Sequence, residues 1–137
     1  FLKPPYGRIT AIDLNTGEHL WQIPNGDGPT DHPLLRDLDL PPLGYSSRPV
    51  PLVTGSLLFL GEGSDVTGGT RGEYQWGTMF RAYDKLTGEI VWEIDVGAGT
   101  PSGPMTYMHE GRQHIIVPLG DRSTNPGWAV FGLRPAA

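Results

Sequence analysis

The sequence contains no cysteine, which excludes disulfide bonds and thiolate metal sites and leaves the redox compartment open. No apolar run approaches the length of a membrane-spanning helix. The 10 lysines and arginines are scattered among 15 acidic residues, and the formal net charge is −5. Because nucleic-acid binding needs basic residues clustered against phosphates, we expect no nucleic-acid partner.

Several motifs that mark particular chemistries are also missing. There is no G-x-S-x-G or Walker-type loop, and the histidines lack metal-site spacing, so hydrolase, nucleotide-phosphate and zinc chemistry are unsupported. One acidic stretch lies in a proline-rich loop, where we expect solvated surface and not a paired glycosidase site; it contains Asp27, Asp31, Asp37 and Asp39. A second stretch, Glu62–Asp65 with Glu73, has only fragments of a calcium loop. We interpret it as a flexible connection.

Glycine and proline are abundant, at 20 and 14 residues, and they fall between short apolar runs. This distribution is typical of the turns of an all-β protein. The pattern A-x-D-x-x-T-G-E-x-x-W occurs twice, beginning at residues 11 and 82. Its fixed positions are Ala11, Asp13, Thr16, Gly17 and Trp21 in the first copy and Ala82, Asp84, Thr87, Gly88 and Trp92 in the second.

Each copy of the repeat predicts a β-hairpin. The Asp accepts backbone N–H bonds where the turn begins, and the Gly adopts a positive φ where it ends. The small Ala leaves room for a large neighbour, and the Trp offers a flat face with one N–H donor. A tryptophan at the same place in successive sheets predicts radial stacking, as in a propeller. The alternative is two unrelated hairpins that share favourable turn residues.

The remaining apolar runs supply further strands of four-stranded blades. We expect strands at 8–13, 18–23, 50–54, 57–61, 79–84, 89–96, 104–109, 112–118 and 128–133. They divide the chain into an outer half-blade at 1–24, a complete blade at 48–97 with a loop insertion at 62–77, and an incomplete closing blade at 102–134. About two and a quarter blades cannot close a ring. We therefore expect a partial β-propeller that needs further blades, supplied by upstream chain rather than by other copies.

The repeat resembles the tryptophan-docking motif of pyrroloquinoline-quinone (PQQ) dependent dehydrogenases. The order of other segments is similar to the C-terminal end of the membrane-associated glucose dehydrogenase branch: P-P-Y-G at 4–7, W-Q-I-P at 21–24, F-R-A-Y-D at 80–84 and G-P-M-T-Y at 103–107. The resemblance implies an eight-bladed propeller with PQQ and Ca²⁺ near its axis. It also implies periplasmic oxidation of an alcohol or sugar, with electrons passed to a quinone or cytochrome acceptor.

The resemblance assigns few site residues to this chain. The family's metal ligands, catalytic Asp and vicinal cysteines match no position, so we assign no catalytic or metal residue and expect no tight cofactor binding by the chain alone. The family's loop at the cofactor and substrate pocket corresponds to Gly120, Asp121 and Arg122, with Asp121 in place of a second Gly. Arg122 would contact the anionic cofactor or a polar substrate, or else lie solvated in its loop. Trp76 would wall the pocket or cap the blade.

Two functions from different classes follow from this pattern. The first is an enzyme part, the C-terminal blades of a quinoprotein dehydrogenase. The alternative is a non-enzymatic periplasmic propeller that acts as a scaffold or interaction module, because such propellers share the docking tryptophans. The P-M-T-Y segment and the terminal loop favour the enzyme.

Overall fold

The computed structural model describes residues 3–64, 77–120 and 125–132 of the 137-residue chain. Its strands form three antiparallel sheets that follow one another along the sequence. The first sheet contains β1 (Arg8–Ile12) and β2 (His19–Pro24). The second contains β3 (Leu52–Val53), β4 (Leu57–Gly61), β5 (Met79–Asp84) and β6 (Ile90–Asp95). The third contains β7 (Met105–His109), β8 (Arg112–Leu119) and β9 (Gly127–Gly132).

Regular structure other than strands is limited, in the described residues, to one short 3-10 helix, η1 (Arg36–Leu38). The expectation of an all-β fold is therefore confirmed. The helix lies in the long connection between β2 and β3, where the sequence predicts only a loop. The four aspartates of this connection are exposed, as expected for a solvated surface.

The strand β3 is shorter than the sequence predicts. We expected strand over residues 50–54, whereas pairing with β4 covers only Leu52–Val53. Pro49 and Pro51 explain the difference, because proline has no N–H to donate to a sheet. The strands β4 and β5 coincide with their predicted ranges, and the others differ from theirs by one or two residues at their ends.

The two repeats form hairpins with the same turn chemistry. In the first, Asp13 Oδ1 accepts hydrogen bonds from the N–H groups two and three residues later, at 2.7 and 3.3 Å. In the second, Asp84 Oδ1 accepts the equivalent pair at 2.8 and 3.1 Å. The turns end at Gly17 and Gly88, whose φ angles are 76° and 77°. These are the bonds and the positive φ expected from the sequence.

The strands of the two hairpins also pair in the same register. Ala11 lies opposite Trp21, and Ala82 lies opposite Trp92. In both hairpins the pairing shifts directly after the alanine, as at a β-bulge. Local sequence therefore determines the same turn and the same strand register twice.

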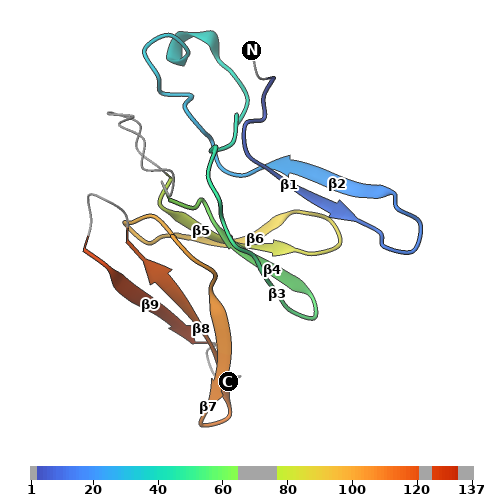
Figure 1. The fold of residues 1–137 in the computed structure, drawn as a ribbon, viewed down its shortest axis with the longest axis vertical. Coiled ribbons are helices and arrows are strands. Elements are labelled where there is room, and N and C mark those ends of the chain that lie inside the picture. Colours follow the sequence, from blue (N-terminus) through green and yellow to red (C-terminus); the bar gives the residue numbers. More distant parts are fainter. Residues whose placement is uncertain (1–2, 65–76, 121–124, 133–137) are drawn as a thin grey trace.

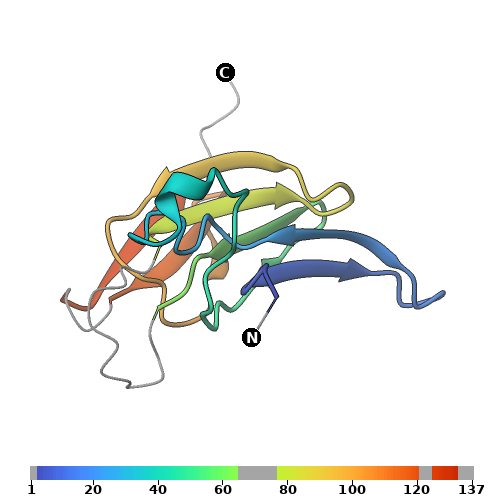
Figure 2. The same cartoon turned by 90° about the horizontal axis from the view of Figure 1, so that it is seen from above.

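The first and third sheets pack against opposite faces of the second (Figures 1 and 2). On one face, buried residues of the second sheet meet half-buried residues of the first: Leu58, Leu60 and Tyr83 against Ile9, Trp21 and Ile23. On the other face, the Phe80 ring stacks on Phe131 of β9 with centroids 6.0 Å apart. Coverage on both faces explains why β5 is almost entirely buried, while the outer strand β6 is exposed.

The strands β2, β4, β6 and β8 all finish at one end of the sheets, because consecutive strands within each sheet run antiparallel (Figure 1). The tight turns lie at the other end. We call the end with the connections the loop edge, and define it by residues 25–51, 61–64, 96–104 and 120. Residues distant in sequence meet there.

Candidate functional site

The loop edge contains the only predicted cofactor-binding residue that falls in the described part of the chain. Gly120 directly follows β8, is buried, and donates its N–H to the Gly99 carbonyl oxygen at 2.9 Å. The structure therefore brings Gly120 to the connection between the second and third sheets. Asp121, Arg122 and Trp76 lie outside the described residues, and their roles stay predictions.

A buried ion pair at the loop edge was not predicted from the sequence. Arg81 on β5 donates from Nη1 to Glu62 Oε1 at 2.5 Å and from Nε to Glu93 Oε2 at 2.9 Å. Glu62 Oε2 also accepts the Met79 N–H at 3.1 Å, and the Glu62 side chain is only 4% exposed. Burial opposes the charged guanidinium, but its hydrogen bonds to the two glutamates raise the pKa of Arg81 above its ordinary value. The guanidinium therefore remains charged and paired.

The ion pair shows that one interpretation from the sequence is wrong. We expected residues 62–65 to begin a flexible connection, yet Glu62 and Ser64 are each 3% exposed. Gly63 forms two hydrogen bonds with Thr100: its N–H donates to Oγ1 at 3.0 Å, and its carbonyl oxygen accepts the Thr100 N–H at 3.1 Å. The start of this connection is thus buried, with Glu62 and Gly63 held by hydrogen bonds. Asp65 and Glu73 lie outside the described residues.

Residues from the long β2–β3 connection close over the same segment. Asn25, which is buried, donates from Nδ2 to the Gly61 carbonyl oxygen at 3.3 Å, and the Ser47 hydroxyl donates to the Glu62 carbonyl oxygen at 2.5 Å. A Cβ atom at Gly26 would lie 2.3 Å from Glu62 Oε1, so glycine is required for this close approach. The segment Gly61–Gly63 therefore contacts both the β2–β3 connection and the β6–β7 connection.

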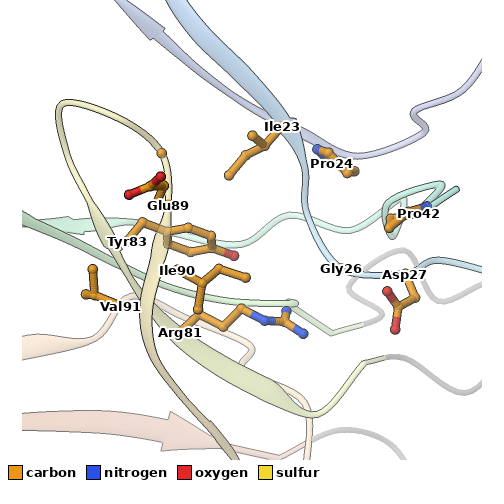
Figure 3. Close-up of a pocket in the computed structure, with 11 residues that line it drawn as sticks. Ile23, Pro24, Gly26, Asp27, Pro42, Arg81, Tyr83, Glu89, Ile90 and Val91 are labelled. Atoms are coloured by element: carbon orange, nitrogen blue, oxygen red, sulfur yellow. The ribbon is translucent and has the colours of Figure 1, made fainter.

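A hollow of about 560 Å³ lies between the first sheet and the second, beside the ion pair. Figure 3 shows Tyr83 and Arg81 pointing into it, with Asp27 on the far side. Its other walls are mostly apolar, formed by Ile23, Pro24, Pro42, Ile90 and Val91. The charge of Arg81 is already balanced by two carboxylates, so the described residues that line the hollow offer no unpaired cation to an anionic ligand.

The buried Tyr83 hydroxyl predicts a pH dependence of stability. Burial raises the pKa of Tyr83 above its ordinary value of 10.0. The folded state thus holds the neutral phenol more strongly than the unfolded state does, so this contribution is complete below about pH 10 and is lost as pH rises further. We expect Tyr83→Phe to lessen the fall in the free energy of unfolding between about pH 10 and 11.5, measured by urea denaturation.

Tyr107→Phe is the matched control for this prediction, because Tyr107 is 42% exposed. The free energy of unfolding of Tyr107→Phe should fall above pH 10 by the same amount as that of the unsubstituted chain. An identical fall in all three proteins would contradict the account of Tyr83.

The described residues do not fit a PQQ–Ca²⁺ site on their own. Within the ranges given above, no group of three or more acidic or histidine side chains is placed to hold a metal ion. A polyanionic cofactor needs free cations or backbone donors, whereas Arg81 is paired with carboxylates and the N–H groups of Gly63 and Gly120 are bonded within the chain. We therefore assign no chemical step to these residues.

The two repeat tryptophans contact the next sheet in different ways. Trp21 Nε1 donates to the Lys85 carbonyl oxygen of the second sheet's hairpin turn at 3.1 Å, and its ring lies so close to Gly88 that a Cβ there would be 2.8 Å away. Trp92 is 40% exposed and packs edge-on against Phe131, with centroids 5.4 Å apart. In the described part of the chain, no hydrogen bond joins the Trp92 indole to the third sheet. Equivalent docking by both indoles stays a prediction.

The sequence did carry a signal for the ion pair. Arg81 stands in F-R-A-Y-D, within a strand whose neighbours are buried on both faces. A buried cation requires a carboxylate, and Glu62 directly follows the strand β4 that pairs with β5. No comparable sequence signal pointed to Thr100.

Comparisons with known proteins identify relatives of this chain. The PQQ family model described as "Glucose/ethanol/alcohol dehydrogenase, beta-propeller domain" matches residues 1–115. The glycerol dehydrogenase large subunit of Gluconobacter thailandicus is 34% identical over 121 residues, which are 86% of this chain and 15% of that protein. The probable quinate dehydrogenase (quinone) of Xanthomonas campestris pv. juglandis is 32% identical over 127 residues, 90% of this chain and 15% of that protein.

Among solved structures, quinohemoprotein alcohol dehydrogenase from Comamonas testosteroni matches 91% of this chain and 16% of its own, with a TM-score of 0.54 and 22% identity. That likeness concerns the fold alone. The chain spans about 15% of the length of the curated relatives it matches. None of the helices in the described residues has the length and apolar character needed to cross a membrane. From the family match over most of its length, the chain belongs to the PQQ family of glucose/ethanol/alcohol dehydrogenase β-propeller domains.

Proposed function

We propose that this chain supplies blades of a quinoprotein dehydrogenase that oxidises an alcohol or sugar hydroxyl with PQQ and Ca²⁺. The family match over residues 1–115 carries the proposal. The order of a two-stranded, a four-stranded and a three-stranded sheet supports it, because such sheets are portions of successive propeller blades. On this proposal the ring has eight blades, and the chain corresponds to its C-terminal part.

The proposal gives this chain the role of pocket wall and not of catalyst. The cofactor, its metal and the base that removes the hydroxyl proton would be held mainly by other blades, because the described residues form no metal cluster and Arg81 is paired with carboxylates. The loop that begins at Gly120, with Asp121 and Arg122, is the part of this chain proposed to approach the cofactor and substrate. Trp76 is proposed as a further wall.

The proposal also includes the electron acceptor and the cellular compartment of the enzyme. A relative named as a quinate dehydrogenase (quinone) supports a quinone as electron acceptor, with a cytochrome as the other possibility in this class. Relatives named for glycerol, glucose and quinate support a hydroxyl-bearing substrate without selecting one. A periplasmic location is proposed from the family resemblance.

An exchange chimera tests the proposal. In the glycerol dehydrogenase large subunit of Gluconobacter thailandicus, the region aligned with this chain is replaced by residues 1–137. We expect PQQ- and Ca²⁺-dependent dye-linked dehydrogenase activity within about tenfold of the parent, a loss of at most about 1.4 kcal/mol of transition-state stabilisation. The same subunit with that region deleted should be inactive, because its ring cannot close.

Two further measurements separate this function from the scaffold alternative. The 137-residue chain alone, with PQQ and Ca²⁺, is expected to show neither turnover nor tight cofactor binding. A chimera that folds and binds PQQ but shows no activity would favour a scaffold. Robust turnover by the chain alone would contradict the proposed division of roles.

A further inference from the structure

We propose that Thr100 is a positioning residue that fixes the end of β8, at Gly120, relative to the second sheet. This inference rests on the proposed function, because it assigns a consequence to the loop that begins at Gly120. It concerns buried contacts within the loop edge and involves neither cofactor nor metal. Its evidence is a path from Glu62 to Gly120 in which hydrogen bonds alternate with links between sequence neighbours.

The first step of the path joins Thr100 to Gly63. The Thr100 backbone N–H donates to the Gly63 carbonyl oxygen, and the Thr100 hydroxyl oxygen accepts the Gly63 N–H. Thr100 is 5% exposed, so water cannot readily replace either bond. The Thr100 side chain also packs against Gly61, where a Cβ atom would lie 2.1 Å from Oγ1. A single residue, through its backbone and its side chain, therefore holds the β6–β7 connection to the end of β4.

The next step joins that connection to the third sheet. The Gly99 carbonyl oxygen, one residue before Thr100, accepts the Gly120 N–H at 2.9 Å. Gly99 is also packed tightly, since a Cβ atom there would be 2.8 Å from Ser64 Cβ. Gly120 is therefore bonded to the residue beside Thr100, in the segment that Thr100 joins to Gly63.

The other end of the path is anchored by the ion pair. Gly63 follows Glu62, whose carboxylate is held by Arg81 and by the Met79 N–H. The Ser47 hydroxyl holds the Glu62 carbonyl oxygen. Several hydrogen bonds hold Glu62 in place. We therefore expect a shift of Thr100 to displace Gly120 and not Glu62. Displacement of a pocket wall by about an ångström is enough to change substrate binding strongly.

Hydrogen exchange of the full chain tests the path itself. Thr100→Val keeps the shape of the side chain but removes the acceptor of the Gly63 N–H. We expect exchange of the Gly63 amide to accelerate by at least about tenfold and that of Gly120 by at least about threefold. Thr100→Ser keeps the hydroxyl and should restore both rates. Thr54→Val is the matched control, because Thr54 makes its hydrogen bonds at the turn end of the same sheet.

Steady-state kinetics of the exchange chimera test the consequence. With PQQ content equalised, Thr100→Val should raise KM about tenfold and change kcat by no more than about twofold, because the reacting groups are assigned to other blades. Thr100→Ser should restore KM, and Thr54→Val should leave it unchanged. Unaltered exchange at Gly120 in Thr100→Val overturns the inference, as does accelerated exchange with an unchanged KM. An inactive parent chimera would instead count against the proposed function, while the exchange rates still decide whether the path exists.

Discussion

Replacing Trp21 with alanine is expected to loosen the first sheet from the second and to lower the free energy of unfolding by about 3 kcal/mol. This lies at the lower end for removal of a core aromatic, because the indole is only half-buried. The substitution removes the packing of the ring on Gly88 and the hydrogen bond to Lys85 O. Urea denaturation of the chain, followed by circular dichroism, measures the change.

One further substitution divides the Trp21 effect into its parts, and a second serves as its control. Trp21→Phe keeps much of the apolar contact but loses the N–H donor. It should lower the free energy of unfolding by about 1 kcal/mol more than the loss of buried apolar area alone predicts. Trp128→Ala is the control, because Trp128 is 63% exposed on the third sheet. Equal losses for Trp21→Ala and Trp128→Ala would contradict a specific role for Trp21 between the sheets.

Replacing Arg81 with methionine is expected to have the larger effect, about 3–5 kcal/mol, because it leaves the Glu62 carboxylate buried without a cation. The Met79 N–H, the remaining donor to that carboxylate in the described residues, cannot balance a full charge. The double substitution Arg81→Met with Glu62→Gln removes both charges and should recover a large part of the loss. The free energies come from the same urea denaturation.

Arg112→Met provides the comparison for Arg81, since Arg112 is an exposed arginine on a strand of the third sheet. It should change the free energy of unfolding by less than about 0.5 kcal/mol. If Arg81→Met cost no more than Arg112→Met, or if the double substitution were as unstable as Arg81→Met alone, the buried ion pair would not have the role described.

The sequence predicted best where local chemistry determines structure. The Asp and Gly of each repeat specify one turn through short-range bonds, so the hairpins and their strands could be placed without knowledge of the rest of the chain. The sequence also predicted that sheets stack on one another, as the first and third sheets do on the second, whereas equivalent docking by Trp21 and Trp92 stays a prediction. The limits of β3 were wrong by a few residues, since the flanking prolines had not been weighed against the apolar run.

The sequence predicted least at the loop edge, where contacts join residues far apart in the chain. Glu62 was interpreted as part of a flexible connection because the stretch around it has only fragments of a calcium loop. Its burial depends on Arg81, 19 residues later, and on the close approach of Gly26. Thr100 and Gly63 carry no local pattern that predicts their reciprocal bonds. Such pairings arise only once the sheets have stacked, so no short-range rule identifies them.

The central claim is that the first sheet lies face-to-face on the second with Trp21 between them, as adjacent blades do. Nuclear Overhauser effects from the Trp21 indole protons of the full chain test this most directly. The account predicts cross-peaks from the Trp21 indole to the Gly88 Hα protons and to the Leu58 and Tyr83 side chains. Cross-peaks from Trp21 confined to its own hairpin would contradict it.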